Sequence, residues 1–508
     1  MNFNRRNFLK TSGAAVAGTM IIPPFVQSCS KLQISVDVKD YLNHFEISTE
    51  SLSRVISEAM SKGGDYADLF FEHKITNNIG LQDGKVNSAS SNIDYGVGIR
   101  VLKGDQTGFA YSESLETGSM LDAAKLAASI ASNPRTFDNK VFNEKKPADY
   151  YKIKTGWEDV SVKDKVPFVQ KINDRIFTMD DKVIKVNAML NDETSYVLFY
   201  DSEGRLSYDY RPMTSFVAVC IMQKGKQIEN SYSSRSYRKG FEWLTDEVVE
   251  ELATEVVDRT NILFDAAKPR AGEMPVVLGA GGSGILLHEA IGHAFEADFN
   301  RKKTSIFSDK MGKKIAESFI NIIDDGTLEN NRGAINIDDE GNDVRKIYLV
   351  KDGVLNSYIH DRISSDYYGV EPTGNGRRQS FRHIPLPRMR STYMEPGPHT
   401  KEDILAEVDY GVYVDNFSNG QVKIGAGDFT FFVKSGYLVE KGRLTQAIKD
   451  INIIGNGPQA LADITMAADD YKTDNGTWTC GKGGQSVPVT MGLPSVLVKS
   501  LTVGGVNA

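Results

Sequence analysis

The chain has 508 residues, which is more than one hydrophobic core usually supports, so we expect two or three domains. Its composition, 40% apolar and 25% charged with 45 glycines against 16 prolines, is that of a globular protein with many turns and strands. The net charge of -8 argues against nucleic acid as the main partner, because phosphates are bound by a basic face.

The N-terminus has the pattern of an export signal. Arg5-Arg6-Asn-Phe-Leu-Lys10 precedes a weakly apolar stretch from Gly13 to Val26, which is typical of a bacterial twin-arginine signal; a short basic amphipathic segment is the alternative. The stretch is too short to span a membrane, which takes about 20 apolar residues. Val26-Gln-Ser-Cys29 resembles a lipobox, so a lipid anchor at Cys29 is possible, with an unlipidated mature protein or an uncleaved anchor as the alternatives. Residues 1–30 thus predict a protein of the periplasm or cell envelope.

Residues 40–150 are predicted to form an N-terminal α/β domain after a linker at 31–48. Helices are expected near 50–62 and at 119–132, where an Ala-rich stretch has apolar residues spaced i, i+3, i+4. Strands are expected at 66–73, 96–102 and 107–111. Asp83-Gly84 and Gly104-Asp105 have the composition of tight turns.

Two further regions complete the predicted α+β, multidomain architecture. The middle mixed domain, 151–265, should contain helices at 162–180 and 247–265 around strands at 183–190, 194–201 and 206–222. The C-terminal domain, 266–508, is glycine-rich and strand-rich, with strands near 277–279 and 347–353. We expect it to carry a metal-binding helix, for the reasons that follow.

One candidate motif is Gly279-x-Gly281-x-x-Gly284, which has the spacing of a dinucleotide-binding loop and lies between a predicted strand and a helix. Such a loop would make the protein an exported, nucleotide-dependent oxidoreductase. The second strand that this fingerprint needs is missing, because the chain after the helix is polar from Asp298 onward. A glycine-rich turn that starts a helix is the simpler interpretation.

The second motif is His288-Glu289-x-x-x-His293. Two imidazoles and a carboxylate this close suit a zinc hydrolase, in which the histidines bind Zn²⁺ and the glutamate is the general base. On a regular α-helix, residues five apart point about 140° away from each other, too far for one ion. The site therefore needs a local i→i+5 widening, which Gly292 would ease, or an early helix end. Two unrelated histidines on an amphipathic helix are the alternative.

Several ordered blocks resemble the TldD/PmbA family of bacterial metallopeptidases, over roughly residues 45–506. They are the His-Glu motif itself and, in chain order, Gly96-Val-Gly-Ile-Arg100, Gly108-Phe-Ala-Tyr111, Thr373-Gly-Asn-Gly-Arg-Arg378, Pro387-Arg-Met-Arg-Ser-Thr-Tyr393, Pro396-Gly397, Cys480-Gly-Lys-Gly-Gly-Gln-Ser-Val-Pro-Val489, Gly492-Leu-Pro494 and Leu501-Thr-Val-Gly-Gly505.

This resemblance implies a zinc-dependent peptidase that hydrolyses unfolded peptides. Zinc would be bound by His288, His293 and Cys480, with Glu289 as catalytic base. The family pairs a motif-bearing subunit with a motif-less PmbA/TldE-type one, so a dimer is expected, either of this chain alone or with such a paralogue. A non-catalytic scaffold subunit remains an alternative. The characterised relatives act in the cytoplasm, so the export signal is a departure.

Other residues near these motifs have simpler interpretations. Glu296 and Asp298 are expected to be solvated carboxylates, although either could be a fourth ligand or orient His293. His360 and His383 lack ligand spacing. The cluster of Arg377, Arg378, Arg382, Arg388 and Arg390 could hold a peptide carboxylate, or form a solvated loop or structural ion pairs. Cys220 lies in an apolar strand and is expected to be a buried small hydrophobe.

Overall fold

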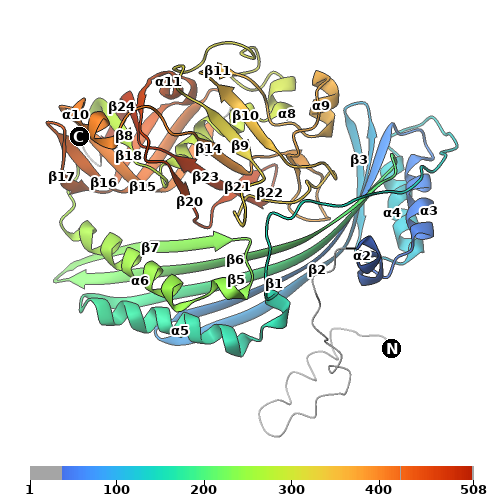
Figure 1. Ribbon diagram of the computed structural model, residues 1–508, viewed down its shortest axis with the longest axis horizontal. Helices are drawn as coiled ribbons and strands as arrows, with labels where there is room; N and C mark the ends of the chain where they lie inside the picture. The colour runs from blue at the N-terminus through green and yellow to red at the C-terminus, as the bar shows by residue number, and fades with distance from the viewer. Residues whose placement is uncertain (1–36, 424, 506–508) are drawn as a thin grey trace, which may run out of the picture.

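The computed structural model describes residues 37–423 and 425–505, in which helices and strands form the predicted α+β architecture (Figure 1). The expected export signal and Cys29 lie outside these residues. No helix of the described ranges combines the length and the apolar character that crossing a bilayer requires.

A seven-stranded sheet occupies the first half of the chain. It has the order β3-β2-β1-β5-β6-β4, with β7 paired to β6. Its strands are β1 (Tyr66–Gln82), β2 (Lys85–Lys103), β3 (Gln106–Ser112), β4 (Asn143–Lys145), β5 (Val183–Asp201), β6 (Arg205–Lys224) and β7 (Gln227–Tyr237). Asp83 and Gly84 join β1 to β2 with φ angles of 54° and 71°, the left-handed conformation that this two-residue turn requires. The two strands expected between 183 and 201 are one continuous strand.

Two groups of helices cover the sheet at its two ends. The first group is α2 (Val38–His44), α3 (Thr49–Met60) and α4 (Thr117–Ala128), and the second is α5 (Val162–Met179) and α6 (Asp246–Asn261). Figure 1 shows α5 and α6 on the face of the long strands that is turned away from the C-terminal region. The prediction of a linker over 31–48 is wrong for α2, a short helix capped by the side chain of Asp37.

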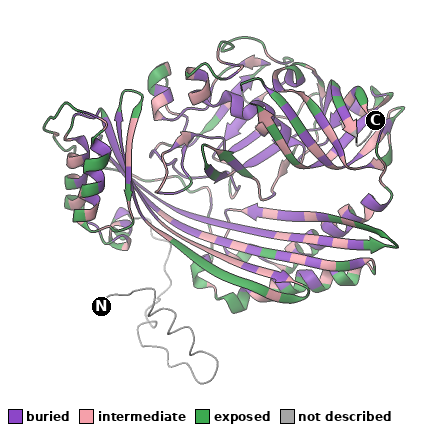
Figure 2. Cartoon of the chain, turned by 180° about the vertical axis from the view of Figure 1, so that it is seen from behind, coloured by how far each residue is buried: buried purple, intermediate pink, exposed green. Residues whose placement is uncertain are grey.

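β1 contributes to both ends of this sheet. Its Ala67, Leu69 and Phe71 pack in the apolar cluster with α3 and α4, whereas Ile79 and Leu81 pack in the cluster with α5 and α6. The predicted boundary near residue 150 therefore separates two regions that share one sheet, and the division into 40–150 and 151–265 stays a prediction. The first half of β2 is exposed and its second half is buried (Figure 2).

The C-terminal region contains a ring of strands beside a second sheet. Pairing of β15 with β16 closes the ring β15-β8-β24-β18-β16, and β17 and β19 are attached to it. These strands are β8 (Gly272–Leu278), β15 (Tyr410–Lys423), β16 (Asp428–Glu440), β17 (Arg443–Ile448), β18 (Ile451–Asn456), β19 (Ile464–Ala467) and β24 (Val496–Gly505). A large apolar core fills this region.

The second sheet and two short ribbons lie beside this ring. The sheet has the order β11-β10-β9-β14-β23-β20. Its strands are β9 (Ile322–Asp325), β10 (Lys346–Lys351), β11 (Val354–Leu355), β14 (Ser391–Met394), β20 (Lys472–Asp474) and β23 (Thr490–Leu493). The ribbons are β12 (Gly376–Arg377) with β13 (Leu386–Pro387), and β21 (Thr479–Lys482) with β22 (Gln485–Pro488). Short helices complete the region: α8 (Ala297–Arg301), α9 (Arg362–Tyr368), α10 (Lys401–Ala406) and α11 (Gly457–Ala462).

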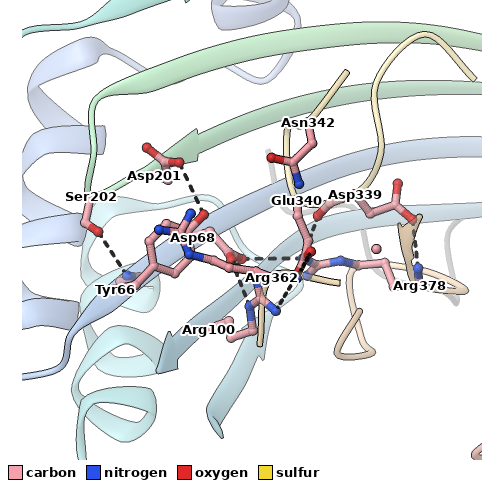
Figure 3. A network of polar contacts seen from close by, with 12 residues as sticks. Tyr66, Asp68, Arg100, Asp201, Ser202, Asp339, Glu340, Asn342, Arg362 and Arg378 are labelled. Atoms are coloured by element: carbon pink, nitrogen blue, oxygen red, sulfur yellow. Dashed lines mark hydrogen bonds and ion pairs between the residues drawn. The ribbon is translucent and has the colours of Figure 1, made fainter. Parts of the chain in front are cut away.

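Buried ion pairs join the first sheet to the C-terminal region (Figure 3). Arg100 on β2 contacts Asp68 on β1 and donates from Nη1 to Glu340 Oε1 at 2.7 Å. Arg211 on β6 donates to Asp339 Oδ1 at 2.6 Å. Removing one partner of such a pair leaves an uncompensated buried charge, which costs about 3–5 kcal/mol. These contacts fix the sheet against the part of the chain that carries the candidate site.

Candidate metal centre

The His-Glu motif lies on an irregular helix that follows β8. The segment consists of α7 (Gly284–Leu286), a π-helical turn η5 (Leu287–Ile291) and a 3₁₀ turn η6 (Gly292–Phe295). The N–H of Gly292 donates to the carbonyl of Leu287, which is an i→i+5 bond and corresponds to the first of the two arrangements expected from the motif spacing. As a result the rings of His288 and His293 lie 5.1 Å apart, centroid to centroid, on the same side of the helix.

Gly292 is required by close packing rather than by its backbone angles. A Cβ added there would lie 2.1 Å from the sulfur of Met389, a fully buried residue. A larger residue here would force the buried side chain of Met389 to move, so glycine lets the widened turn approach the segment before β14.

The third candidate ligand comes from a distant part of the chain. Cys480, on β21, places its Sγ 3.4 Å from Nε2 of His293. One ligand atom each from His288, His293 and Cys480 lie within 4.8 Å of one another, and all three side chains are buried. The structure thus brings together the three residues predicted as ligands.

His288 gives the sharpest indication that this cluster is suited to a cation. The residue is 1% exposed, and neither of its ring nitrogens has a hydrogen-bond partner in the described protein. Buried polar groups are almost always bonded, so these free nitrogens need an explanation. Two imidazoles and a thiol form a donor set that suits Zn²⁺ and leaves a fourth tetrahedral position open.

The charges in the cluster favour a thiolate. Burial alone would raise the pKa of the Cys480 thiol, but the adjacent His288 and His293 hold it well below its ordinary value. Burial would likewise lower the pKa of His293, yet Glu296 and Cys480 raise it well above the usual range. Because the thiolate is the form that binds metal, this environment prepares Cys480 for a cation.

Glu289 lies beside the cluster and is partly open to solvent. Its Oε2 is 3.8 Å from Nε2 of His293, and 24% of its side chain is exposed, against 4% for that of His293. A carboxylate in this position can reach both a group at the cluster and water from outside.

A buried carboxylate orients His293 from the other side. Nδ1 of His293 donates to Oε2 of Glu296 at 3.0 Å, so Nε2 points toward Cys480. Lys482 contacts Glu296 at 3.0 Å and Asp298 at 2.7 Å. Burial would raise the pKa of Glu296, but Lys482 and His293 lower it to about 2. The expectation of a solvated carboxylate is wrong for Glu296, which is fully buried.

Lys482 is a residue that the sequence interpretation missed. It stands two positions after Cys480 on β21 and therefore on the same face of the strand, which is the signal that could have identified it. Arg388 was considered only within a basic cluster. It is fully buried, and its Nη2 donates to the backbone carbonyl of Cys480 at 2.5 Å, which fixes the strand that carries the thiol.

The remaining candidates lie outside the cluster. His360 is buried, and burial lowers its pKa to about 4, whereas His383 contacts Ser380 at 3.1 Å. Arg382 pairs with Asp94 and Glu113 in a partly exposed position, while the other arginines of the basic cluster are buried rather than in a solvated loop: Arg377, Arg378, Arg388 and Arg390.

The glycine loop before α7 is used for packing. The N–H groups of Gly279 and Gly281 donate to the carbonyls of Val414 and Leu493. A phosphate-binding loop needs its N–H groups free for the ligand, so this arrangement disfavours the nucleotide alternative.

Cys220 is buried, as expected, and has no disulfide partner in the described chain. Burial raises the pKa of its thiol to about 12.

Models of known families match the chain in four places. The PmbA/TldA metallopeptidase domain 1 matches residues 67–131, the central domain 156–264 and the C-terminal domain 271–505. A twin-arginine translocation signal matches residues 2–21. The first three matches cover most of the described chain.

Similar proteins are named as metalloproteases. The chain is 37% identical over 469 residues to a protein of Haemophilus influenzae named metalloprotease TldD homolog, covering 91% of this chain and 97% of that protein. It is 28% identical over 454 residues to the zinc metalloprotease TldD homolog of Saccharolobus solfataricus, covering 89% and 99% of the two chains.

Solved structures share the fold. A Thermotoga maritima protein named as a candidate modulator of DNA gyrase superposes with a TM-score of 0.73 at 22% identity, covering 90% of this chain and 99% of the other. TldE from Thermococcus kodakarensis superposes with a TM-score of 0.69 at 20% identity, covering 90% and 100%.

Proposed function

The chain belongs to the TldD/PmbA family of metallopeptidases, and we propose that it is a catalytically active, zinc-dependent member that hydrolyses unfolded peptides. The observation that carries the proposal is the convergence of His288, His293 and Cys480 around the unpartnered ring nitrogens of His288. A subunit without a metal would gain nothing from burying this donor set.

In this proposal the chain's own residues position the reacting groups. His288, His293 and Cys480 would hold zinc, which when bound supplies Lewis acidity that polarises a peptide carbonyl and lowers the pKa of water. Glu289 accepts the proton of the attacking water at its carboxylate and delivers it to the leaving amine. Glu296 keeps Nδ1 of His293 protonated and Nε2 directed at the cluster.

Unfolded peptides are the proposed substrates because the cluster is buried between the C-terminal sheets, where a folded domain would not reach it. The twin-arginine signal supports export, and we propose the periplasm or cell envelope as its site of action, with a lipid on Cys29 as one means of retention.

We also propose a dimer, either of two copies of this chain or with a motif-less PmbA/TldE-type subunit, and the likeness with TldE lends support to the second pairing. Light scattering during size-exclusion chromatography tests this assembly, since a fully active monomer would contradict it.

The test of the function is metal analysis combined with peptide hydrolysis. We expect about one zinc per chain, cleavage of unstructured peptides, loss of activity with a chelator and recovery on adding zinc back. Bound nicotinamide or flavin without metal would instead support the oxidoreductase, and zinc without hydrolysis of any unstructured peptide would support the scaffold subunit.

Glu289→Gln separates metal binding from catalysis. The variant should retain zinc and lose activity by several orders of magnitude, because the amide cannot accept a proton from water. Hydrolysis at the normal rate would show that Glu289 is not the general base.

A further inference from the structure

A cavity of about 430 Å³ lies between the first sheet and the C-terminal region. Side chains of β1, β5 and β6 line one side, and the ribbons β12–β13 and β21–β22 line the other. Thr479 and Val487 border the cavity, and Cys480 lies beside the first of these and opposite the second across the ribbon. The ribbon that carries Cys480 therefore forms part of the cavity wall.

Three buried guanidinium groups line this cavity without a carboxylate partner. They belong to Arg238, Arg332 and Arg377, which are 4%, 9% and 3% exposed. Their hydrogen-bond acceptors are backbone carbonyls and serine or threonine hydroxyls, and none of the three forms an ion pair within the described residues. The buried Nε of Arg238 has no acceptor there at all.

The carboxylates of the cavity neutralise these charges only in part. Three of the four carboxylates already have a cation of their own: Asp339 with Arg211, Asp192 with Lys165 and Glu72 with Lys74. Glu193 is the fourth, and it makes no ion pair among the described residues. Three unpaired guanidiniums thus face one carboxylate, which leaves a cationic surplus in a buried place.

The energetic cost of this cationic surplus is visible in the lowered pKa values of two of the arginines. Burial and, to a smaller extent, the neighbouring Arg238 lower the pKa of Arg332 to about 10, although Glu193 acts in the opposite direction. Burial, followed by Arg390, Arg388 and Arg238, lowers the pKa of Arg377 well below its ordinary value, although Asp339 acts in the opposite direction. A guanidinium stays charged in proteins, so an anion that enters the cavity would offset this cost.

The remaining lining identifies the kind of anion. Met189, Met213, Val217, Ile335 and Val487 give the cavity an apolar wall beside its cations. An acidic amino-acid residue has an apolar stem and a planar carboxylate that matches the guanidinium fork, whereas a bare inorganic anion would leave the apolar wall without a partner.

We propose that this cavity binds a carboxylate of the peptide substrate, either an acidic side chain or the C-terminal carboxylate, and so directs the peptide to the metal cluster, whose Cys480 the ribbon β21–β22 carries. The inference rests on the proposed peptidase function for the identity of its ligand. The chain would then favour unfolded peptides that carry a carboxylate near the bond to be cleaved.

The experiment measures peptide binding to zinc-loaded Glu289→Gln protein, which does not turn the peptides over. Fluorescence anisotropy is followed for four unstructured peptides of one sequence, with Glu or Gln at an internal position and with a free or amidated C-terminus. We expect the peptide with the recognised carboxylate to bind on the order of tenfold to a hundredfold more tightly than its neutral counterpart, as charge-assisted bonds do. The pair that shows the difference tells which carboxylate is bound.

Single variants then assign the effect to the cavity. Arg332→Gln and Arg238→Gln, each made in the Glu289→Gln background, should remove most of the preference while the neutral peptide binds as before. Arg175→Gln is the matched control, because Arg175 lies on α5, pairs with Glu250 at the surface and is outside the cavity. Zinc content and thermal unfolding of each variant report whether it is folded.

The outcomes keep the two proposals apart. Equal binding of all four peptides would overturn the carboxylate site and, if wild-type protein with zinc cleaves them, would leave the peptidase function standing. A clear preference that Arg332→Gln and Arg238→Gln both leave intact would also overturn the site. A preference that depends on these arginines, without cleavage by the wild type, would keep the carboxylate site and refute the peptidase.

Discussion

In the proposed zinc site, the contact between Glu296 and His293 predicts that metal affinity depends on the carboxylate of Glu296, which is outside the proposed ligand set. Glu296→Gln keeps the size of the side chain and one acceptor oxygen but removes its charge. His293 then loses the anion that holds Nδ1–H in place, and Lys482 loses one of its two carboxylate partners.

The lowered pKa of Glu296 shows how strongly its surroundings hold the charged carboxylate. Despite burial, its pKa falls from 4.5 to about 2 because of Lys482 and His293. At about 1.4 kcal/mol per pKa unit, this preference for the charged form is about 3 kcal/mol in the metal-free protein. Removal of a carboxylate that supports a metal-binding histidine lowers metal affinity roughly 10- to 100-fold.

We therefore expect Glu296→Gln to weaken zinc binding by about 10- to 100-fold in competition with a chromophoric chelator. Asp298→Asn is the matched control, because Asp298 also contacts Lys482 but not His293, and its effect should be about threefold or less. If Glu296→Gln binds zinc as tightly as the wild type, or if both variants weaken it equally, the orienting role of Glu296 is refuted.

Two further predictions concern Cys480 and Gly292. Cys480→Ser should lower zinc affinity and activity, whereas Cys220→Ser should leave both nearly unchanged. A Cys220–Cys480 disulfide found in active enzyme by non-reducing mass spectrometry would contradict the assignment of Cys480 as a ligand. Gly292→Ala should lower the free energy of unfolding by about 1–3 kcal/mol in urea and weaken zinc binding, because its Cβ would overlap Met389. Gly118→Ala, on α4 with open space around the added carbon, is the matched control and should be neutral or slightly stabilising.

The irregular helix was predictable because the spacing of the motif conflicts with a regular one. Histidines five residues apart cannot share an ion on an α-helix, so a shared site needed either a widened turn or an early helix end, and η5 is the widened turn. The burial of Glu296 was not predictable in this way. A glutamate is exposed by default, and the lysine that compensates it, Lys482, lies 186 residues further along the chain.

The full length of strand β1 was not predicted, for a related reason. The run from His73 to Asn78 is polar and half-buried, because it lies between the part of β1 that packs with α3 and the part that packs with α5. This break in the apolar pattern ended the predicted strand at residue 73, although backbone pairing with β5 continues to Gln82. Strand pairing satisfies the backbone of such a segment whatever its side chains are.

Several contacts that hold this molecule together join residues far apart in the sequence. This separation determines the order in which parts of the structure can form. Arg100 and Glu340 are 240 residues apart, His293 and Cys480 are 187 apart, and β8 pairs with β24 at the end of the chain. A newly made chain therefore has no ligand cluster until its last strands have been synthesised, and contacts of this range form slowly. An export route that accepts a finished fold would carry these contacts across the membrane intact. A twin-arginine signal is suited to that requirement, because it sends proteins across the membrane after they have folded.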